Sequence, residues 1–361
     1  MTEEQEDIIS LYGVPCVGAK TYALLVARFG SPGAVFRASK TALMAMDGIG
    51  PVVAENILSH DRRAYIRNQK HLIEKFSVQI ITRLSSGYPP SLDTFASAPP
   101  VLFVRGDPEA LKKTSIAFVG TRKPSSYGIK MTRKLVTESV DAGLCVVSGM
   151  AAGIDATAHR AALDAGGVTV AVFGCGVDTI YPTVNRTLSN DIMKSGCLVS
   201  HFTMGTSCRA GNFPARNAVI VGLSIGTIVV EAPEKSGALI TADLTLKAGR
   251  KLFTVPGNID STTSEGTNYL FTKGAQPVSS MEYVLKMLGK PVPAHTQKRE
   301  TRPLPEGMAG EILNVLTEEP LHVEALCKQL DKSVWEILSE LTILEIEGLV
   351  RQKPGKIFER I

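Results

Sequence analysis

With 361 residues the chain is too long for one ordinary domain, and we expect two or three. Hydrophobic residues make up 44% of it and charged residues 20%, which is the composition of a folded soluble protein. The net charge of +4 is too small for a general nucleic-acid-binding surface, so any site for anions must be local.

The cysteines and the start of the chain indicate the compartment. Six cysteines are scattered without a Cys-x-x-Cys pair, which argues against a zinc site and against a disulfide framework. The chain begins with an acidic segment, unlike the basic end of a signal peptide, and no apolar stretch is long enough to span a bilayer. We therefore expect a cytoplasmic protein without a membrane partner.

Residues 1–80 are predicted to form an all-helical domain, because apolar residues recur there at helical spacing. Two hairpin candidates occur, at 13–18 and 47–57. The second resembles a helix-hairpin-helix element, in which a Gly-x-Gly turn such as Gly48 to Gly50 exposes amides to a DNA phosphate. A plain helical packing unit fits as well. Few lysines or arginines flank these glycines, so DNA binding here is not favoured.

A proline-rich bridge, residues 81–113, leads into an α/β body that extends to residue 289. Short apolar runs in the body end near glycines or turns before a helical stretch, which predicts a Rossmann-like parallel sheet with helices on both faces. Ligands bind such sheets at the carboxyl ends of the strands, and helix N-termini there attract anions. The body therefore offers a surface for phosphates. The runs are 114–122, 144–153, 168–176, 227–232 and 251–257.

A polar, proline-rich linker, 290–306, precedes a third domain at 307–361. Helical apolar spacing marks three helices, and Pro354-Gly355 separates two short strands, which together predict a winged helix. Its third helix carries four glutamates, and carboxylates would repel a phosphate backbone. A packing or protein-contact role is therefore favoured over DNA recognition.

The first loop of the body, Gly120–Gly128, combines backbone amides with cations, hydroxyls and an aromatic ring. Arg122 and Lys123 suit a phosphate, and Tyr127 suits a base or a sugar. The alternative is that Ser125 only caps the following helix and that Arg122 is a solvated charge. The density of polar groups at a strand end favours the site.

The second loop, Ser148–His159, contains small residues that allow a ligand to approach the backbone closely. Asp155 and His159 are four residues apart on a helix and share a face. They could form the acid–base pair of a hydrolase. A structural ion pair or a hydrogen-bonded cap explains them equally, and we favour it.

Two later segments complete the edge. Phe213–Ser224 carries a ring, a guanidinium and an amide before an apolar helix, and an exposed Phe213 could stack on a base. The segment 231–241 again presents amides and a serine at a helix start. The sequence contains no Walker-type phosphate loop, dinucleotide fingerprint, nucleophile elbow or metal cluster, so we expect binding without catalysis, cofactor or metal.

Taken together, six motifs resemble, in the same order, those of the DNA-processing protein A family, also called DprA or Smf. They cover nearly the whole body, and the flanking helical (SAM-like) and winged-helix domains match the family plan. The motifs lie at 120–128, 148–159, 213–217, 236–242, 255–258 and 266–268.

The resemblance implies a homodimer that binds single-stranded DNA, protects incoming strands in natural transformation and loads the RecA recombinase, without catalytic activity. Arg122 would contact phosphate, Phe213 would stack and Asn217 would shape the pocket. The full set of candidate DNA-binding residues is Gly120, Thr121, Arg122, Ser125, Tyr127, Gly149, Gly153, Arg209, Phe213, Arg216, Asn217, Ser236, Gly237 and Thr241.

Three positions depart from the family pattern. Ala210 stands where a lysine is usual, with Arg209 one position earlier, and Ala218 and Asp243 stand where relatives carry arginine. The loss of cations should lower DNA affinity and flatten its salt dependence.

Two other functions remain open. One is a nucleotide hydrolase of the nucleoside-monophosphate phosphoribohydrolase type, in which Asp155, His159 or Glu231 would supply acid–base chemistry. The other is a protein adaptor with weakened DNA binding. Dimerisation is not visible in the sequence and is implied by the resemblance alone. Leu244, Leu246 and Phe253 look exposed and are candidates for the interface; the alternative is that they only pack the last helix and strand onto the sheet.

Overall fold

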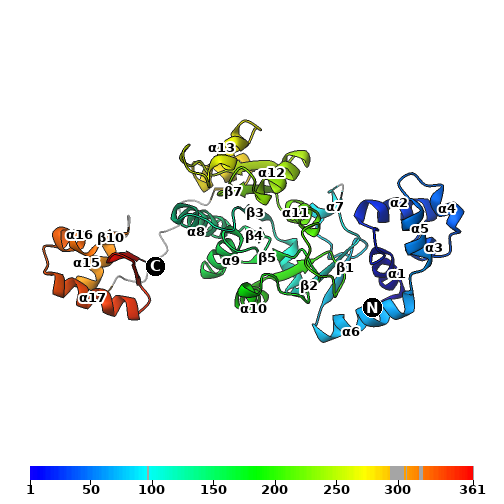
Figure 1. The fold of residues 1–361 in the computed structure, drawn as a ribbon, viewed down its shortest axis with the longest axis horizontal. Helices are drawn as coiled ribbons and strands as arrows, with labels where there is room; N and C mark the ends of the chain where they lie inside the picture. Colours follow the sequence, from blue (N-terminus) through cyan, green and yellow to red (C-terminus); the bar gives the residue numbers. More distant parts are fainter. Residues whose placement is uncertain (96, 293–304, 306, 317–319, 361) are drawn as a thin grey trace. The chain divides into compact units, whose positions relative to one another are not determined.

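The structure is a computed structural model that describes residues 1–95, 97–292, 305, 307–316 and 320–360 (Figure 1). It divides into two compact units, Met1–Pro293 and Ala294–Ile361. Most of the expected linker at 290–306 lies outside the described residues.

The first unit begins with a group of helices, as predicted. Two hairpins are present, one between α1 and α2 and one between α4 and α5. Gly48 has φ +84°, which favours glycine, and Gly50 caps α5 without a side-chain hydrogen bond. Leu11, Leu25 and Leu43 are fully buried in the core of this group. The helices are α1 (Glu3–Tyr12), α2 (Ala19–Phe29), α3 (Pro32–Val35), α4 (Lys40–Met44), α5 (Pro51–Leu58) and α6 (Arg62–Lys75).

A nine-stranded sheet follows, in the order β1-β2-β6-β5-β4-β3-β7-β8-β9. The strands from β6 to β9 in this order are parallel, whereas β2 runs antiparallel to both β6 and β1. The strands are β1 (Gln79–Thr82), β2 (Val101–Gly106), β3 (Ser115–Val119), β4 (Cys145–Ser148), β5 (Thr169–Val172), β6 (Cys197–Ser200), β7 (Gly226–Val229), β8 (Lys251–Thr254) and β9 (Gln276–Pro277).

The predicted parallel sheet is present, with strands that the sequence did not mark. The proline-rich bridge supplies the antiparallel β2, β1 begins inside the segment expected to be all helical, and β9 forms the opposite edge. The sequence also missed β6, because its four residues are followed by His201 and Phe202 instead of by glycine. The five strands that the glycine pattern marked, β3, β4, β5, β7 and β8, are all present.

Helices cover both faces of this sheet. Along β3, Ile116 and Phe118 pack on one face with α8, α9 and α14, while Ala117 and Val119 pack on the other with α11 and α12. The helical segments are α7 (Pro90–Asp93), η1 (Pro108–Lys112), α8 (Ser126–Asp141), α9 (Ile154–Asp164), η2 (Thr183–Asn185), α10 (Arg186–Ser195), α11 (Asn212–Leu223), α12 (Gly237–Lys247), α13 (Glu265–Phe271) and α14 (Met281–Met287).

The strand order reverses direction between β3 and β7. From β3 the chain proceeds through β4 and β5 to β6 on one side, and β7, β8 and β9 extend the sheet on the other. Loops that leave two such strands at their carboxyl ends diverge and open a crevice, which is where ligands bind in open α/β sheets. Here those loops are 120–125 and 230–236.

The second unit is a winged helix, as expected. Three helices pack on a sheet of order β10-β12-β11 around fully buried Ile312, Leu326 and Leu341. The strands β11 and β12 flank Pro354-Gly355 as predicted, and β10 is additional. The elements are α15 (Met308–Val315), β10 (Leu321–His322), α16 (Val323–Leu330), α17 (Val334–Ile346), β11 (Val350–Lys353) and β12 (Ile357–Arg360).

The suggested dimer interface is wrong at Phe253, which is fully buried in β8. Leu244 and Leu246 are half-buried on α12, and Leu246 packs against the core. In the part of the chain that the structure describes, no helix is long and apolar enough to cross a bilayer, and no cluster of three or more potential ligands could hold a metal ion.

Two buried histidines should make stability depend on pH. Burial lowers the pKa of His159 to about 3 and that of His201 to about 4, from an ordinary value of 6.5. Between these values and pH 6.5 the unfolded chain binds more protons than the folded one. The contribution of these histidines to the free energy of unfolding is therefore fully present above pH 6.5. It is lost on acidification, by up to about 1.4 kcal/mol per pH unit for each histidine.

We expect urea unfolding to show this loss between pH 7 and pH 5. The double variant His159→Gln/His201→Gln should be less stable than the native protein at pH 7, but its free energy of unfolding should fall less between pH 7 and pH 5. An equal loss in both proteins would assign the pH dependence to other groups.

Candidate nucleic-acid interface

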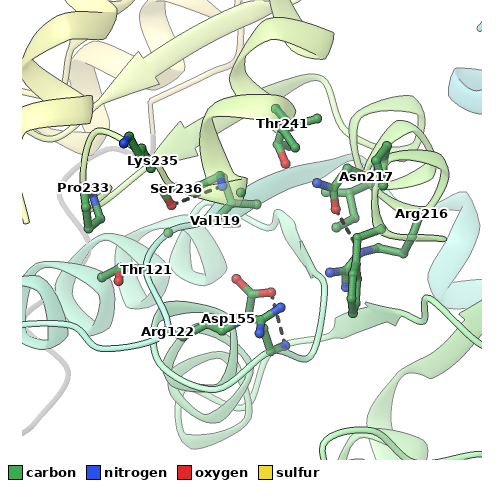
Figure 2. A pocket seen from close by; sticks show the side chains of 18 of the residues that line it. Val119, Thr121, Arg122, Asp155, Arg216, Asn217, Pro233, Lys235, Ser236 and Thr241 are labelled. Carbon is green, nitrogen blue, oxygen red and sulfur yellow. Dashed lines mark hydrogen bonds between the residues drawn. The ribbon is translucent and has the colours of Figure 1, made fainter. Parts of the chain in front are cut away.

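A cleft of about 660 Å³ lies at the reversal of the strand order, where the crevice was expected (Figure 2). Most of its lining comes from the loop after β3, the first turns of α11 and the loop that leads into α12; Ala151 and Asp155 from the segment after β4, and Thr263, complete it. Nine of the predicted residues are among those lining it: Gly120, Thr121, Arg122, Phe213, Arg216, Asn217, Ser236, Gly237 and Thr241.

Three exposed cations give the cleft its charge. Arg122 and Lys123 follow β3, and Lys235 stands on the loop before α12, across the cleft from Thr121 in Figure 2. Among the described residues none of the three forms an ion pair with a carboxylate. Their positive charges are therefore available to an anionic ligand. Lys235 was not among the candidate residues predicted from the sequence. Its position directly before Ser236, the N-cap of α12, is the signal that could have identified it.

Phe213 supplies the aromatic surface. It is half-buried in the first turn of α11, and its ring lies on the boundary between the cleft and a smaller cavity of about 100 Å³. The guanidinium carbon of Arg122 is 5.6 Å from the ring centroid and that of Arg216 is 5.3 Å from it. Such cation–π contacts hold the ring in place beside the cations.

Arg216 is a structural residue beneath the cleft and not an exposed cation. It is 6% exposed, and its guanidinium donates to Asn217 Oδ1 (2.9 Å), to Val172 O (3.0 Å) and to Gly149 O. Burial lowers its pKa, while the charge of Asp155 raises it. These hydrogen bonds join α11 to the ends of β4 and β5, while the predicted contact of Arg216 with DNA stays a prediction.

Two glycines of the candidate set allow the loops around the cleft to pack closely against neighbouring backbone and side chains. A side chain at Gly120 would meet Ile154 and the carbonyl of Glu231, so only glycine fits between β7 and α9. Gly153 has φ +82° and lies against the backbone of Thr121 and Arg122 at the start of α9. These contacts hold the loop that carries Arg122. Gly149 lines the smaller cavity.

Asp155 and His159 do not pair with each other. Asp155 accepts hydrogen bonds from Gly149 N (3.2 Å) and Ala151 N (3.3 Å), which is the hydrogen-bonded cap that we favoured. Burial raises the pKa of Asp155, and the positive charge of Arg216 opposes this shift. His159 lies in the core, where its Nδ1 is 2.7 Å from Thr169 Oγ1. The acid–base pair of the hydrolase hypothesis is thus not formed.

Ser125 and Tyr127 face away from the cleft. Ser125 caps α8, as its alternative interpretation proposed, and its hydroxyl donates to Glu231 Oε1 (2.5 Å). The Tyr127 hydroxyl donates to Pro256 O (2.9 Å). Both line a separate cavity of about 410 Å³ beside Glu231. Arg209 is exposed and donates to Ser207 Oγ (3.2 Å) but does not line the cleft, whereas Ala210 does.

Comparison with protein families gives three matches along the chain. The model described as DNA recombination-mediator protein A matches residues 79–289, more than half of the chain. A DprA winged helix domain matches residues 296–356, and a helix-hairpin-helix motif matches residues 8–68.

The chain belongs to the DNA recombination-mediator protein A family. Among its DprA/Smf relatives, Protein Smf of Synechocystis sp. is 32% identical over 90% of this chain and 91% of its own length. The X-ray structure of DprA from Streptococcus pneumoniae has a TM-score of 0.69 at 32% identity and covers 79% of this chain and 98% of that one.

A second solved structure is that of DNA processing protein A from Helicobacter pylori, described by its single-stranded DNA binding mode. It has a TM-score of 0.54 at 30% identity and covers 59% of this chain and 96% of that one. The resemblance that the sequence motifs indicated is thereby confirmed.

Proposed function

We propose that this member of the family binds single-stranded DNA along the cleft. The observation that carries the proposal is the convergence of Arg122, Lys123 and Lys235 beside the Phe213 ring at the carboxyl edge of the sheet. Cations attract the phosphates and the ring stacks on a base, a combination that tolerates any sequence. The H. pylori relative, described by its single-stranded DNA binding mode, supports it.

Membership of the family supports a wider role. A cytoplasmic homodimer would protect incoming strands in natural transformation and load the RecA recombinase onto them, without turnover. The contacts of the candidate acid–base groups support a non-enzymatic role: Asp155 and His159 are engaged inside the protein, and Glu231 accepts from Ser125 and from Thr263 Oγ1 (3.1 Å).

Fluorescence anisotropy of a labelled oligothymidine tests the site. Binding should weaken with salt, and Arg122→Ala should lower the affinity about tenfold and reduce the slope of log affinity against log salt by about 0.7, the share of one phosphate contact. Arg133→Ala, which removes an exposed arginine from α8, is the control and should bind like the native protein. Absence of binding at low salt, or equal effects of the two variants, would refute the cleft as the site.

A protein-contact role for the winged helix is the second candidate. Helix α17, which enters the groove in DNA-reading winged helices, exposes Trp335 (84%) and Ile346 (82%) together with Glu336 and Glu345. Exposed tryptophan favours a protein partner and carboxylates disfavour DNA. Trp335 is the one tryptophan of the sequence, so its emission reports on α17 in the same titration. Quenching by the oligonucleotide would place DNA on this helix instead.

A further inference from the structure

A second group of basic side chains lies outside the cleft, on α6. Arg63, Arg67, His71 and Lys75 are spaced four residues apart and are all exposed. Residues at this spacing lie on adjacent turns of a helix, so the four form one row along its surface. We call this row the basic stripe.

The basic stripe carries charge that the protein itself does not neutralise. Its neighbours on α6 are paired: Arg62 with Asp7, and Lys70 with Glu6 at 2.6 Å. In the part of the chain that the structure describes, no ion pair involves a member of the stripe, and Glu74 is the one carboxylate on α6. The like charges of Arg63 and Arg67, four residues apart, repel each other, and an anionic polymer would relieve the repulsion.

The stripe is held rigidly on the first unit. On the opposite side of α6, Gln69 is 1% exposed. Its Nε2 donates to Met204 O (3.0 Å), and the backbone N–H of Met204 donates to its Oε1 (3.0 Å). Met204 belongs to the loop after β6, and the same loop continues through Ala210 to Phe213 in the cleft. One loop therefore joins the helix that bears the stripe to the wall of the cleft.

We propose that the basic stripe is a second binding site for the phosphate backbone of single-stranded DNA, which a strand reaches after leaving the cleft. The site differs from the helix-hairpin-helix turn, because it uses side-chain cations of α6 and not the amides around Gly48 and Gly50. Because its cations would contact phosphates and not base edges, it would contribute affinity without sequence preference. The proposal rests on the proposed function of the cleft.

The test compares two lengths of labelled oligothymidine: about 6 nucleotides, the range of a single binding surface, and about 30, which extends beyond it. The variant Arg63→Gln/Arg67→Gln should bind the short strand like the native protein. For the long strand its affinity should fall about tenfold and its salt slope should decrease by about 1.4, two contacts of about 0.7 each. The control, Arg133→Gln/Lys134→Gln, removes two exposed cations from α8 and should leave both lengths unchanged.

The outcomes separate the stripe from the cleft. If Arg63→Gln/Arg67→Gln weakens binding of both lengths equally, or does not weaken binding of the long strand, the proposal that the stripe binds DNA is overturned. A loss confined to double-stranded DNA of the same length would also overturn it. Arg122→Ala should weaken both lengths. If it weakens neither while the stripe variant weakens the long strand, the cleft fails as a site, and the stripe binds DNA by itself instead of continuing a path from the cleft. Unchanged thermal unfolding of the variants confirms that each is folded.

Discussion

Replacing Arg216 by alanine is expected to lower the free energy of unfolding by about 3 kcal/mol. The guanidinium donates to Val172 O, Gly149 O and Asn217 Oδ1 inside the protein. Its removal leaves these acceptors without a partner and leaves the buried Asp155 without the positive charge that opposes its desolvation. An unpaired buried charge is among the most costly defects in a folded protein.

Urea unfolding measures the effect. Arg122→Ala is the matched control, because it removes the same side chain from an exposed position of the same cleft and should change stability by about 0.5 kcal/mol or less. Arg216→Lys should recover little, since an ammonium cannot present the planar fork that reaches the acceptors. If Arg216→Ala unfolds at the same urea concentration as the native protein, Arg216 is not structural and a direct contact with DNA becomes its better explanation.

The contrast between these two arginines shows what the sequence could determine. Arg122 was placed correctly in the cleft, because the strand before it and the glycines around it fix a loop at the carboxyl edge of the sheet. Arg216 follows a helix start, and whether its side chain points outward or into the sheet depends on how α11 is rotated. That rotation is set by packing with β3, β4 and β5, which no local pattern records.

The same limit explains Ser125 and Tyr127. Both follow the Arg122 loop in the sequence, and the pattern treated the whole stretch as one site. The chain turns into α8 at Ser125, however, and a helix start directs successive side chains to different sides. Ser125 therefore bonds to Glu231 and Tyr127 to Pro256, on the far side of the loop.

The sheet was predictable where strands are followed by glycine and a helix, as at β3 and β4. It was not predictable at β2, because a strand that returns antiparallel from a proline-rich segment has no periodicity that distinguishes it from a buried loop. Four of its six residues, Phe103 to Gly106, pair with Cys197 to Ser200 of β6, so the strand depends on a contact between segments that are far apart in the sequence. This edge also carries α6 and the loop to Phe213, so the error concerned the part of the fold that links the stripe to the cleft.

Ala210→Lys is expected to raise the affinity for single-stranded DNA about tenfold and to steepen the salt slope by about 0.7. Ala210 is exposed and lines the cleft one turn before Phe213, so a lysine there adds a cation beside the ring without disturbing the core. The other two positions that depart from the family pattern are less suitable for adding a cation to the cleft. Ala218 is half-buried in α11, and Asp243 is not among the residues that line the cleft and pairs with Lys247 at 2.7 Å.

The controls are Ala210→Gln, which adds a long polar side chain without charge, and Asp243→Asn, which removes a carboxylate outside the cleft. Anisotropy titrations at several salt concentrations should show the gain for lysine alone. Equal gains in affinity for lysine and glutamine would indicate contacts other than with phosphate. A gain for Asp243→Asn would mean that the net charge of the surface, and not contacts in the cleft, governs binding. A gain for lysine that disappears when Arg122 is also replaced by alanine would show that the two cations hold adjacent phosphates, because independent sites contribute additively.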